Sequence, residues 1–166
     1  ASFAQKVLQK STTLEYLLVN KDFVFTTLIE YLSQPTEAVQ PSIETVLNLI
    51  TQLARDTQDD FYDYFHQILK LLIGHFVPTT VEYVRTFFRC IGFMFYFLRQ
   101  KIYEGYTELF EIFVPAFFAH KKDYARRLAA DTLAGLTVRL PNKRKLHKIL
   151  LRLCDEHFAD SKECAE

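Results

Sequence analysis

The 166-residue sequence has no tryptophan, only four glycines and five prolines, and only three cysteines. Proteins built from β-strands and tight turns normally use more glycine and proline, so this scarcity favours long helices. Because Cys90, Cys154 and Cys164 are odd in number and irregularly spaced, we expect reduced thiols of the cytosol or nucleus. The composition therefore argues against a secreted, disulfide-linked β protein.

Long apolar runs and a leader segment are also missing. Charges such as Arg85, Arg89 and Arg99 interrupt the longest runs, and no basic-then-apolar signal opens the chain. We therefore expect no membrane association. Because the sequence begins with alanine rather than methionine and ends in a polar run, we also expect it to be a fragment of a longer protein.

The chain carries no net charge, since 20 basic residues balance 20 acidic ones. The whole chain is therefore not drawn toward nucleic acid or anionic lipid. The charges are unevenly distributed, however. Residues 1–63 hold 4 basic and 9 acidic side chains, whereas residues 139–152 hold 6 basic and none acidic.

The sequence is rich in apolar side chains, at 49% of residues, including 16 Phe and 9 Tyr, enough for one domain-sized core. These side chains recur at spacings of three and four, which predicts helices at about residues 2–19, 22–33, 43–54, 59–74, 79–98, 101–118, 123–140 and 142–158. Thr79 and Glu82 have the spacing of a capping box, and Asp59, Asp123 and Asn142 suit helix N-termini. Pro115 predicts a kink inside its helix.

The apolar stripes repeat along the chain. Phe61 to Ile73 matches Tyr106 to Phe118 at an offset of 45 residues, and Phe65 to Leu72 matches Phe25 to Leu32 at an offset of 40. The stripes between them repeat as well, since Ile43 to Ala54 matches Val84 to Phe95 at an offset of 41 residues. Two helices per repeat of this length is typical of HEAT or armadillo repeats.

We therefore predict an all-α fold, an α-solenoid of HEAT-type antiparallel helix pairs. Residues 1–158 would form about three to four pairs, and residues 159–166 a frayed polar tail. A closed bundle of four to six helices is the competing architecture. The small residues from Ala125 to Gly135 favour HEAT, because they let neighbouring repeats approach closely.

The best candidate for a binding site is basic. Six cations within fourteen residues could contact phosphates and release counterions, namely Arg139, Lys143, Arg144, Lys145, Lys148 and Arg152. No aromatic side chains interleave with them, so we expect contact with RNA backbone rather than stacking on bases. An acidic protein is an alternative partner, and a solvated helix face with no ligand is the alternative to any site.

Residues that could support metal binding or catalysis have simpler explanations. Cys154, His157 and Cys164 lack a fourth zinc ligand at a suitable spacing. The aspartates at 59, 60 and 63 fit a helix N-terminus better than a calcium loop. The remaining histidines pair with no nucleophile, and no glycine-rich phosphate loop occurs. We therefore predict a non-enzyme without catalytic residues, cofactor, metal or small-molecule substrate.

Three stretches resemble one known family. Leu49 to Asp56 followed by Asp60 to Phe65, then Thr86 to Leu98, then Tyr124 to Leu136 are similar, in this order, to helices near the N-terminus of the DRIM family. The resemblance covers roughly Val46 to Leu136. Asp63 departs from it, since the family pattern has proline there. DRIM proteins are very large HEAT-repeat components of the small-subunit processome.

The resemblance implies a function as well as a fold. It implies a non-catalytic scaffold segment of a small-ribosomal-subunit assembly factor, located in the nucleus and nucleolus and acting in pre-rRNA processing. Its partners would be ribosome-assembly proteins and, through phosphate contacts, pre-rRNA or small nucleolar RNA. The alternative is another HEAT scaffold, such as a nuclear transport receptor or a phosphatase scaffold, that binds protein partners.

Overall fold

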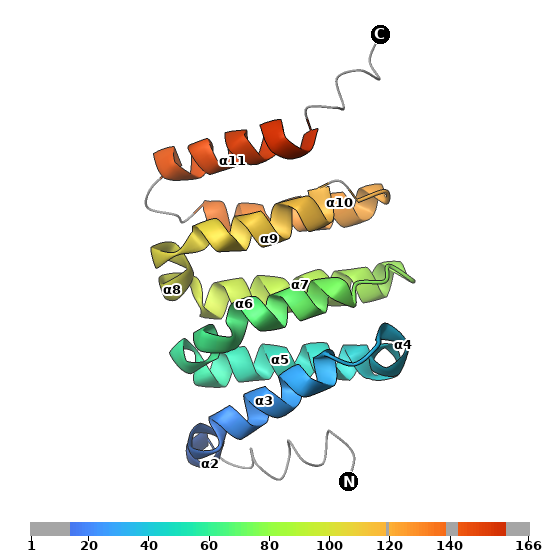
Figure 1. The fold of residues 1–166 in the computed structure, drawn as a ribbon, viewed down its shortest axis with the longest axis vertical. Coiled ribbons are helices and arrows are strands. Elements are labelled where there is room, and N and C mark those ends of the chain that lie inside the picture. Colours follow the sequence, from blue (N-terminus) through green and yellow to red (C-terminus); the bar gives the residue numbers. More distant parts are fainter. Residues whose placement is uncertain (1–13, 119, 139–142, 159–166) are drawn as a thin grey trace. The chain divides into compact units, whose positions relative to one another are not determined.

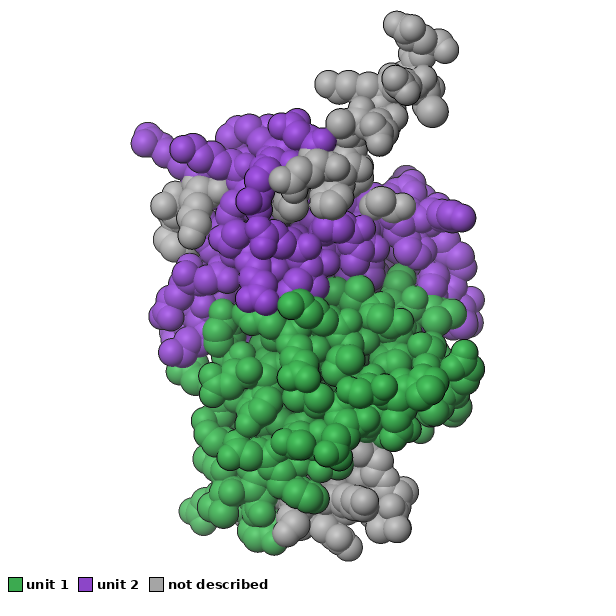
Figure 2. Space-filling view, in the orientation of Figure 1, with its two compact units in different colours: residues 1–77 green, residues 78–166 purple. Residues whose placement is uncertain are grey.

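The structure is a computed structural model that describes residues 14–118, 120–138 and 143–158. Within these ranges every regular element is a helix and no strand occurs, so the all-α prediction is confirmed (Figure 1). The chain divides into two compact units, residues 1–77 and 78–166, which Figure 2 colours separately.

Unit 1 contains α2 (Leu14–Val19), α3 (Lys21–Leu32), the short α4 (Thr36–Val39), the 3-10 turn η1 (Gln40–Ser42), α5 (Ile43–Thr57) and α6 (Asp59–Gly74). Helix α6 packs against both α3 and α5. Only Gln58 separates α5 from α6, and its φ of 41° is a conformation that non-glycine residues rarely adopt. This abrupt turn reverses the chain and makes α5 and α6 an antiparallel pair.

Unit 2 contains α7 (Val81–Phe97), α8 (Arg99–Glu104), α9 (Tyr106–Phe118), α10 (Asp123–Thr137) and α11 (Lys143–Phe158). Helix α10 packs against α7 and α9, and α11 packs against α9. Figure 1 shows α9 and α11 side by side along their lengths, in agreement with these contacts. The unit is therefore built from helices that pack along, rather than across, one another.

Several helix boundaries differ from the sequence-based expectation. The N-cap of α7 is Thr80 rather than Thr79, because the Thr80 hydroxyl accepts a 3.1 Å hydrogen bond from the Tyr83 amide. The helix expected from residue 101 is split into α8 and α9 at Gly105. Helix α10 ends at Thr137 and has Asp123 in its first turn rather than at its N-cap. The elements α4 and η1 were not expected, since residues 36–42 are too few to show helical periodicity.

The repeated stripes are the buried faces of the helices. In α6, all five residues that are buried belong to the stripe, and the same holds for α9 at the positions 45 residues later. In α5 and α7, every stripe position related by the offset of 41 is buried, from Ile43 and Val84 to Ala54 and Phe95. The periodicity thus identifies the core correctly, since removal of these faces from water is the main favourable term in folding.

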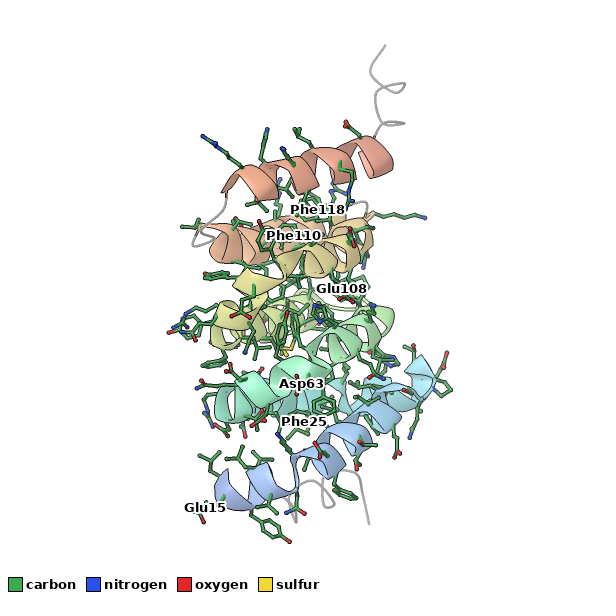
Figure 3. The ribbon with its side chains drawn as sticks, turned by 60° about the vertical axis from the view of Figure 1, so that its left-hand side comes forward. Glu15, Phe25, Asp63, Glu108, Phe110 and Phe118 are labelled. Carbon is green, nitrogen blue, oxygen red and sulfur yellow. The ribbon has the colours of Figure 1, made fainter. Side chains whose placement is uncertain are left out.

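The core of unit 1 is closed by an aromatic contact and by a histidine. Phe25 on α3 lies with its ring centroid 4.5 Å from that of Tyr64 and 5.3 Å from that of Phe61, both on α6; Figure 3 marks Phe25 and, on α6, Asp63. The imidazole of His75, directly after α6, is 6% exposed. Its two nitrogens contact the carbonyl oxygen of Leu32 at 2.5 Å and the hydroxyl of Thr36 at 3.1 Å.

Both ring nitrogens of His75 are engaged in these contacts. The Leu32 carbonyl can only accept, so Nε2 donates to it, and Nδ1 forms a hydrogen bond with the Thr36 hydroxyl. The backbone carbonyl of His75 also accepts a 2.7 Å hydrogen bond from the Gln40 side chain. His75 thereby ties the ends of α3 and α6 to α4 and η1, a structural role that the sequence did not indicate.

Candidate nucleic-acid interface

The basic segment lies on α11, the last helix of unit 2. Its backbone is helical from Lys143, which places Lys143, Arg144, Lys145, Lys148 and Arg152 on one continuous helix. Arg139 lies outside the described residues, and so do the side chains of Lys143 and Lys145. The structure therefore describes three of the six predicted side chains: Arg144, Lys148 and Arg152.

The three described cations share one side of the helix. Arg144, Lys148 and Arg152 are spaced by four residues, which puts them in one row along α11, and all three are exposed. On the opposite side Leu146 and Ile149 are each 8% exposed and face the unit. The helix is thus amphipathic, with an apolar face that packs and a basic row that faces solvent.

One of the three cations already has a partner. The guanidinium of Arg152 forms an ion pair with the carboxylate of Glu111 on α9, and both side chains are about half exposed. The pair contributes about 0–1 kcal/mol, as exposed ion pairs usually do. Arg144 and Lys148 form no ion pair or hydrogen bond with a described residue. The positive potential of the row is therefore strongest toward the N-terminal half of α11.

The other candidate residues are engaged in local contacts or lie outside the description. Asp60 forms an ion pair with Lys21, and Asp59 begins α6. No group of three or more His, Cys, Asp or Glu side chains is placed to hold a metal ion in the described part of the chain. The side chains of Cys154 and His157, and all of Cys164, fall outside it.

Sequence reasoning missed a second polar surface, on α7. Arg85 and Arg89 are exposed there, and Phe93 and Tyr96 are exposed although they are aromatic. Beside them, facing α10, the surface is hollowed. A row of arginines and aromatic residues at spacings of three and four is the signal that could have revealed this surface, but Arg85 and Arg89 enter the sequence-based prediction only as interruptions of apolar runs.

No helix within the described ranges is both long enough and apolar enough to cross a membrane. The fold and the exposed surfaces define an all-α protein with two helical units, a basic row on α11 and a hollowed face on α7. No protein-family model matches the chain.

Two curated proteins are similar to it, and both carry the name U3 small nucleolar RNA-associated protein 20. The protein of Saccharomyces cerevisiae is 22% identical over 144 residues, or 84% of this chain, and that of Schizosaccharomyces pombe is 25% identical over 160 residues, or 95%. The chain spans only 6% of the length of each of these relatives. The similarity therefore connects this chain to one small part of a much longer protein whose name associates it with the U3 small nucleolar RNA.

Proposed function

We propose that this chain is a non-catalytic scaffold segment of a small-ribosomal-subunit assembly factor, acting in pre-rRNA processing within the small-subunit processome of the nucleolus. The observation that carries the proposal is the similarity to two proteins named for the U3 small nucleolar RNA, which extends over 84% and 95% of the chain. The DRIM resemblance of residues 46–136 lies within the same region and points to the same kind of protein.

The proposal includes the architecture. Residues 1–158 would be about three to four HEAT-type helix pairs near the N-terminus of a longer solenoid, followed by a polar tail. Two facts support this. The stripes related by offsets of 41 and 45 residues are buried, and within unit 2 the contacts of α7 with α10 and of α9 with α11 resemble the two layers of stacked pairs.

The proposal contains no chemical step. The contacts of His75 with Leu32 and Thr36 and the ion pair of Asp60 with Lys21 support structural roles for both residues. Scaffolds act through surfaces, and the surface of this chain that is most suited to phosphates is the basic row of α11. We include Arg139, Lys143 and Lys145 with Arg144, Lys148 and Arg152 in this RNA-binding surface, on the basis of their charge and sequence position.

The assembly role is tested in cells with the tagged protein that contains this chain. We expect it to sediment with small-subunit precursors in a gradient and to co-purify with U3 RNA and other assembly proteins. A tagged nucleolar protein of another pathway is the matched control. Sedimentation apart from these precursors would contradict the proposal, and recovery mainly with nuclear transport or phosphatase subunits would favour the alternative HEAT scaffold.

The role of α11 is tested by charge reversal at Lys143, Arg144, Lys145 and Lys148, each changed to Glu. Each lost phosphate contact should lower the slope of log K against log salt by about 0.7 to 0.9, so four lost contacts lower it by roughly 3. The measurement is fluorescence anisotropy with a structured RNA across a salt series. Reversal at Arg55, Lys70, Lys121 and Arg127, none of which belongs to α11, gives the same change in net charge and is the control. Equal slopes in the two variants would remove the α11 interface.

A further inference from the structure

Unit 2 has a groove along the contact of α7 with α10. It consists of three adjoining hollows of about 280, 440 and 390 Å³. The first two share Asp131 and Thr132, the first and third share Gly92 and Tyr96, and the second and third share Arg89. Because each hollow shares wall residues with the other two, the three form one continuous depression, which we call the α7/α10 groove.

Two residues that line the groove, Gly92 and Gly135, have no side chain. A Cβ atom built on Gly92 would have only the Thr132 methyl group as a near neighbour, at 4.0 Å, and one built on Gly135 would have none within 4 Å. Both glycines lie inside helices, where glycine costs about 1 kcal/mol relative to alanine. Close packing does not require glycine at either position, so the space is open to a ligand.

One wall of the groove carries both cations and aromatic rings. On α7, Arg85, Arg89, Phe93 and Tyr96 follow one another at spacings of four, four and three residues, which keeps them on one side of the helix, and Arg99 follows at the start of α8. The four positions on α7 span about 16.5 Å at 1.5 Å per helical residue. Phe93 and Tyr96 are 43% and 51% exposed, unlike the other aromatic residues of α7 that face the core.

The charged groups of the groove are only partly neutralised. Arg85 forms an exposed ion pair with Glu82, at 3.2 Å, and among the described residues that line the hollows Asp131 on α10 is the only carboxylate. Arg89 has no ion pair or hydrogen bond with any described residue. The three arginines thus outnumber Glu82 and Asp131, so these side chains together carry a net positive charge.

Arg99 and Tyr96 form a ready-made stacking surface. The Arg99 guanidinium lies 4.8 Å from the centroid of the Tyr96 ring and donates a 2.9 Å hydrogen bond to the Tyr96 carbonyl oxygen. A guanidinium held against a tyrosine ring presents a flat, positively charged unit, and such units stack on bases. The orientation of this unit is set before any ligand arrives, which lowers the entropic cost of binding.

We propose that the α7/α10 groove binds a single strand of nucleic acid, with Phe93 and Tyr96 stacked on bases and Arg85 and Arg89 at phosphates. Cations that track a backbone, combined with exposed aromatic rings, are the combination that such strands require. An extended acidic peptide is the competing ligand, and the test below includes it as an outcome. The inference does not depend on the ribosome-assembly role.

The test measures fluorescence anisotropy of labelled ten-nucleotide RNA and DNA single strands, and of a duplex of the same length, with the whole chain. The double variant Phe93→Ala, Tyr96→Ala should bind the single strands at least roughly ten-fold more weakly, since each lost stack has a large effect. Its affinity for the duplex, whose bases are already stacked, should change less than about two-fold. The control is Tyr16→Ala, Phe23→Ala, which removes two exposed aromatic residues of unit 1.

A second variant separates loss of binding from loss of structure. Gly135→Leu fills the groove and, because leucine favours helix, should leave the melting temperature equal or higher while binding weakens roughly ten-fold. The matched control is Gly74→Leu in unit 1, where a Cβ also has no neighbour within 4 Å. A stable Gly135→Leu protein with parental affinity would overturn the proposal.

Two further outcomes would also overturn it. One is equal single-strand binding by the parent and the Phe93→Ala, Tyr96→Ala variant. The other is that an acidic peptide with aromatic residues displaces the nucleic acid from the groove and binds more tightly than either the RNA or the DNA strand. Dependence on these aromatic residues for RNA alone, DNA alone or both supports the proposal and identifies the preferred strand. The variant with charge reversal at Lys143, Arg144, Lys145 and Lys148 should still bind single strands in a manner that depends on Phe93 and Tyr96. Failure of the α11 interface and failure of the groove can therefore be distinguished.

Discussion

The two units fill the same helix positions with different chemistry. In α6 of unit 1 the positions Ile68, Leu69 and Leu72 are aliphatic, and in α9 of unit 2 the positions 45 residues later are Phe113, Val114 and Phe117. In α5 and α7 the pair Val46 and Leu47 likewise becomes Phe87 and Phe88. The spacing of the apolar residues therefore specifies which face of a helix is buried, but it does not specify whether aliphatic or aromatic side chains occupy that face.

The units also differ in how polar groups join their helices. Unit 1 links α3 to α6 through a 2.7 Å hydrogen bond from Tyr64 to Asp22, an ion pair of Lys21 with Asp60, and the buried His75. In unit 2 rings join α9 to α7, and Phe117 lies 4.7 to 6.0 Å, centroid to centroid, from Phe113, Phe88 and Phe87. Unit 1 thus adds polar links to its ring contacts, whereas this part of unit 2 is joined by an aromatic cluster.

The largest expected effect comes from breaking the aromatic cluster. Phe117→Ala should lower the free energy of unfolding by about 3–5 kcal/mol, because Phe117 is fully buried and its removal leaves a cavity. Phe117→Leu, which introduces the residue found at the matching position of α6, should cost less. The measurement is urea unfolding, with hydrogen exchange of peptides from each unit to locate the loss. Phe23→Ala, an exposed control, should cost under about 1 kcal/mol, and equal losses at 117 and 23 would contradict the comparison.

The polar closure of unit 1 should give a smaller effect. His75→Ala removes the imidazole that contacts the Leu32 carbonyl and the Thr36 hydroxyl, and leaving a buried polar group unpaired costs about 1–3 kcal/mol. The measurement is the same urea titration, with faster exchange expected at the ends of α3 and α6. His147→Ala on the exposed face of α11 is the control. If both variants have parental stability, His75 does not hold unit 1 together.

The smallest effect depends on pH and concerns Tyr64. The hydrogen bond to Asp22 raises the pKa of Tyr64 to about 12, with burial as the second cause. The group stabilises the folded state fully below the unfolded pKa of about 10, and this contribution is lost as pH rises toward 12. The parent should therefore be more stable than Tyr64→Phe at pH 8 and the difference should shrink above pH 10.

Burial also raises the pKa of Tyr106 in unit 2, so parent and variant both lose stability in alkali, and only their difference reports on Tyr64. The measurement is thermal unfolding of both proteins at several pH values. Tyr103→Phe, which removes a hydroxyl from unit 2, is the control. A difference between the parent and Tyr64→Phe that is constant from pH 8 to 12 would show that the Asp22 hydrogen bond does not control Tyr64.

The sequence predicted the helices and their buried faces because both depend on local periodicity. The sequence-based prediction failed where a single residue determines a helix boundary. Gly105 splits α8 from α9 and Thr80 replaces Thr79 as the N-cap, and such choices depend on backbone geometry that no periodic pattern contains. The apolar stripe of α6 also did not predict that His75 is buried, since a buried histidine at the end of a helix follows no regular spacing.

The candidate interfaces show the same limit. A run of cations such as Arg144 and Lys148 is visible in any sequence, and their exposure follows from the apolar residues between them. The α7/α10 groove requires two helices to lie side by side although their residues, such as Gly92 and Gly135, are 43 positions apart in the chain. Because that contact is tertiary, the groove could be recognised only in three dimensions.

The rate at which a thiol reagent labels Cys90 on α7 reports how often this part of unit 2 opens. The Cys90 thiol is 2% exposed and unoxidised, so a thiol reagent can reach it only when the helix leaves the core. The labelling rate of this one sulfur, followed by mass spectrometry of its peptide, counts the openings of α7 without any mutation or dye. If a nucleic-acid strand bound in the groove slows this labelling, the decrease in rate measures how much the bound strand stabilises α7 against opening.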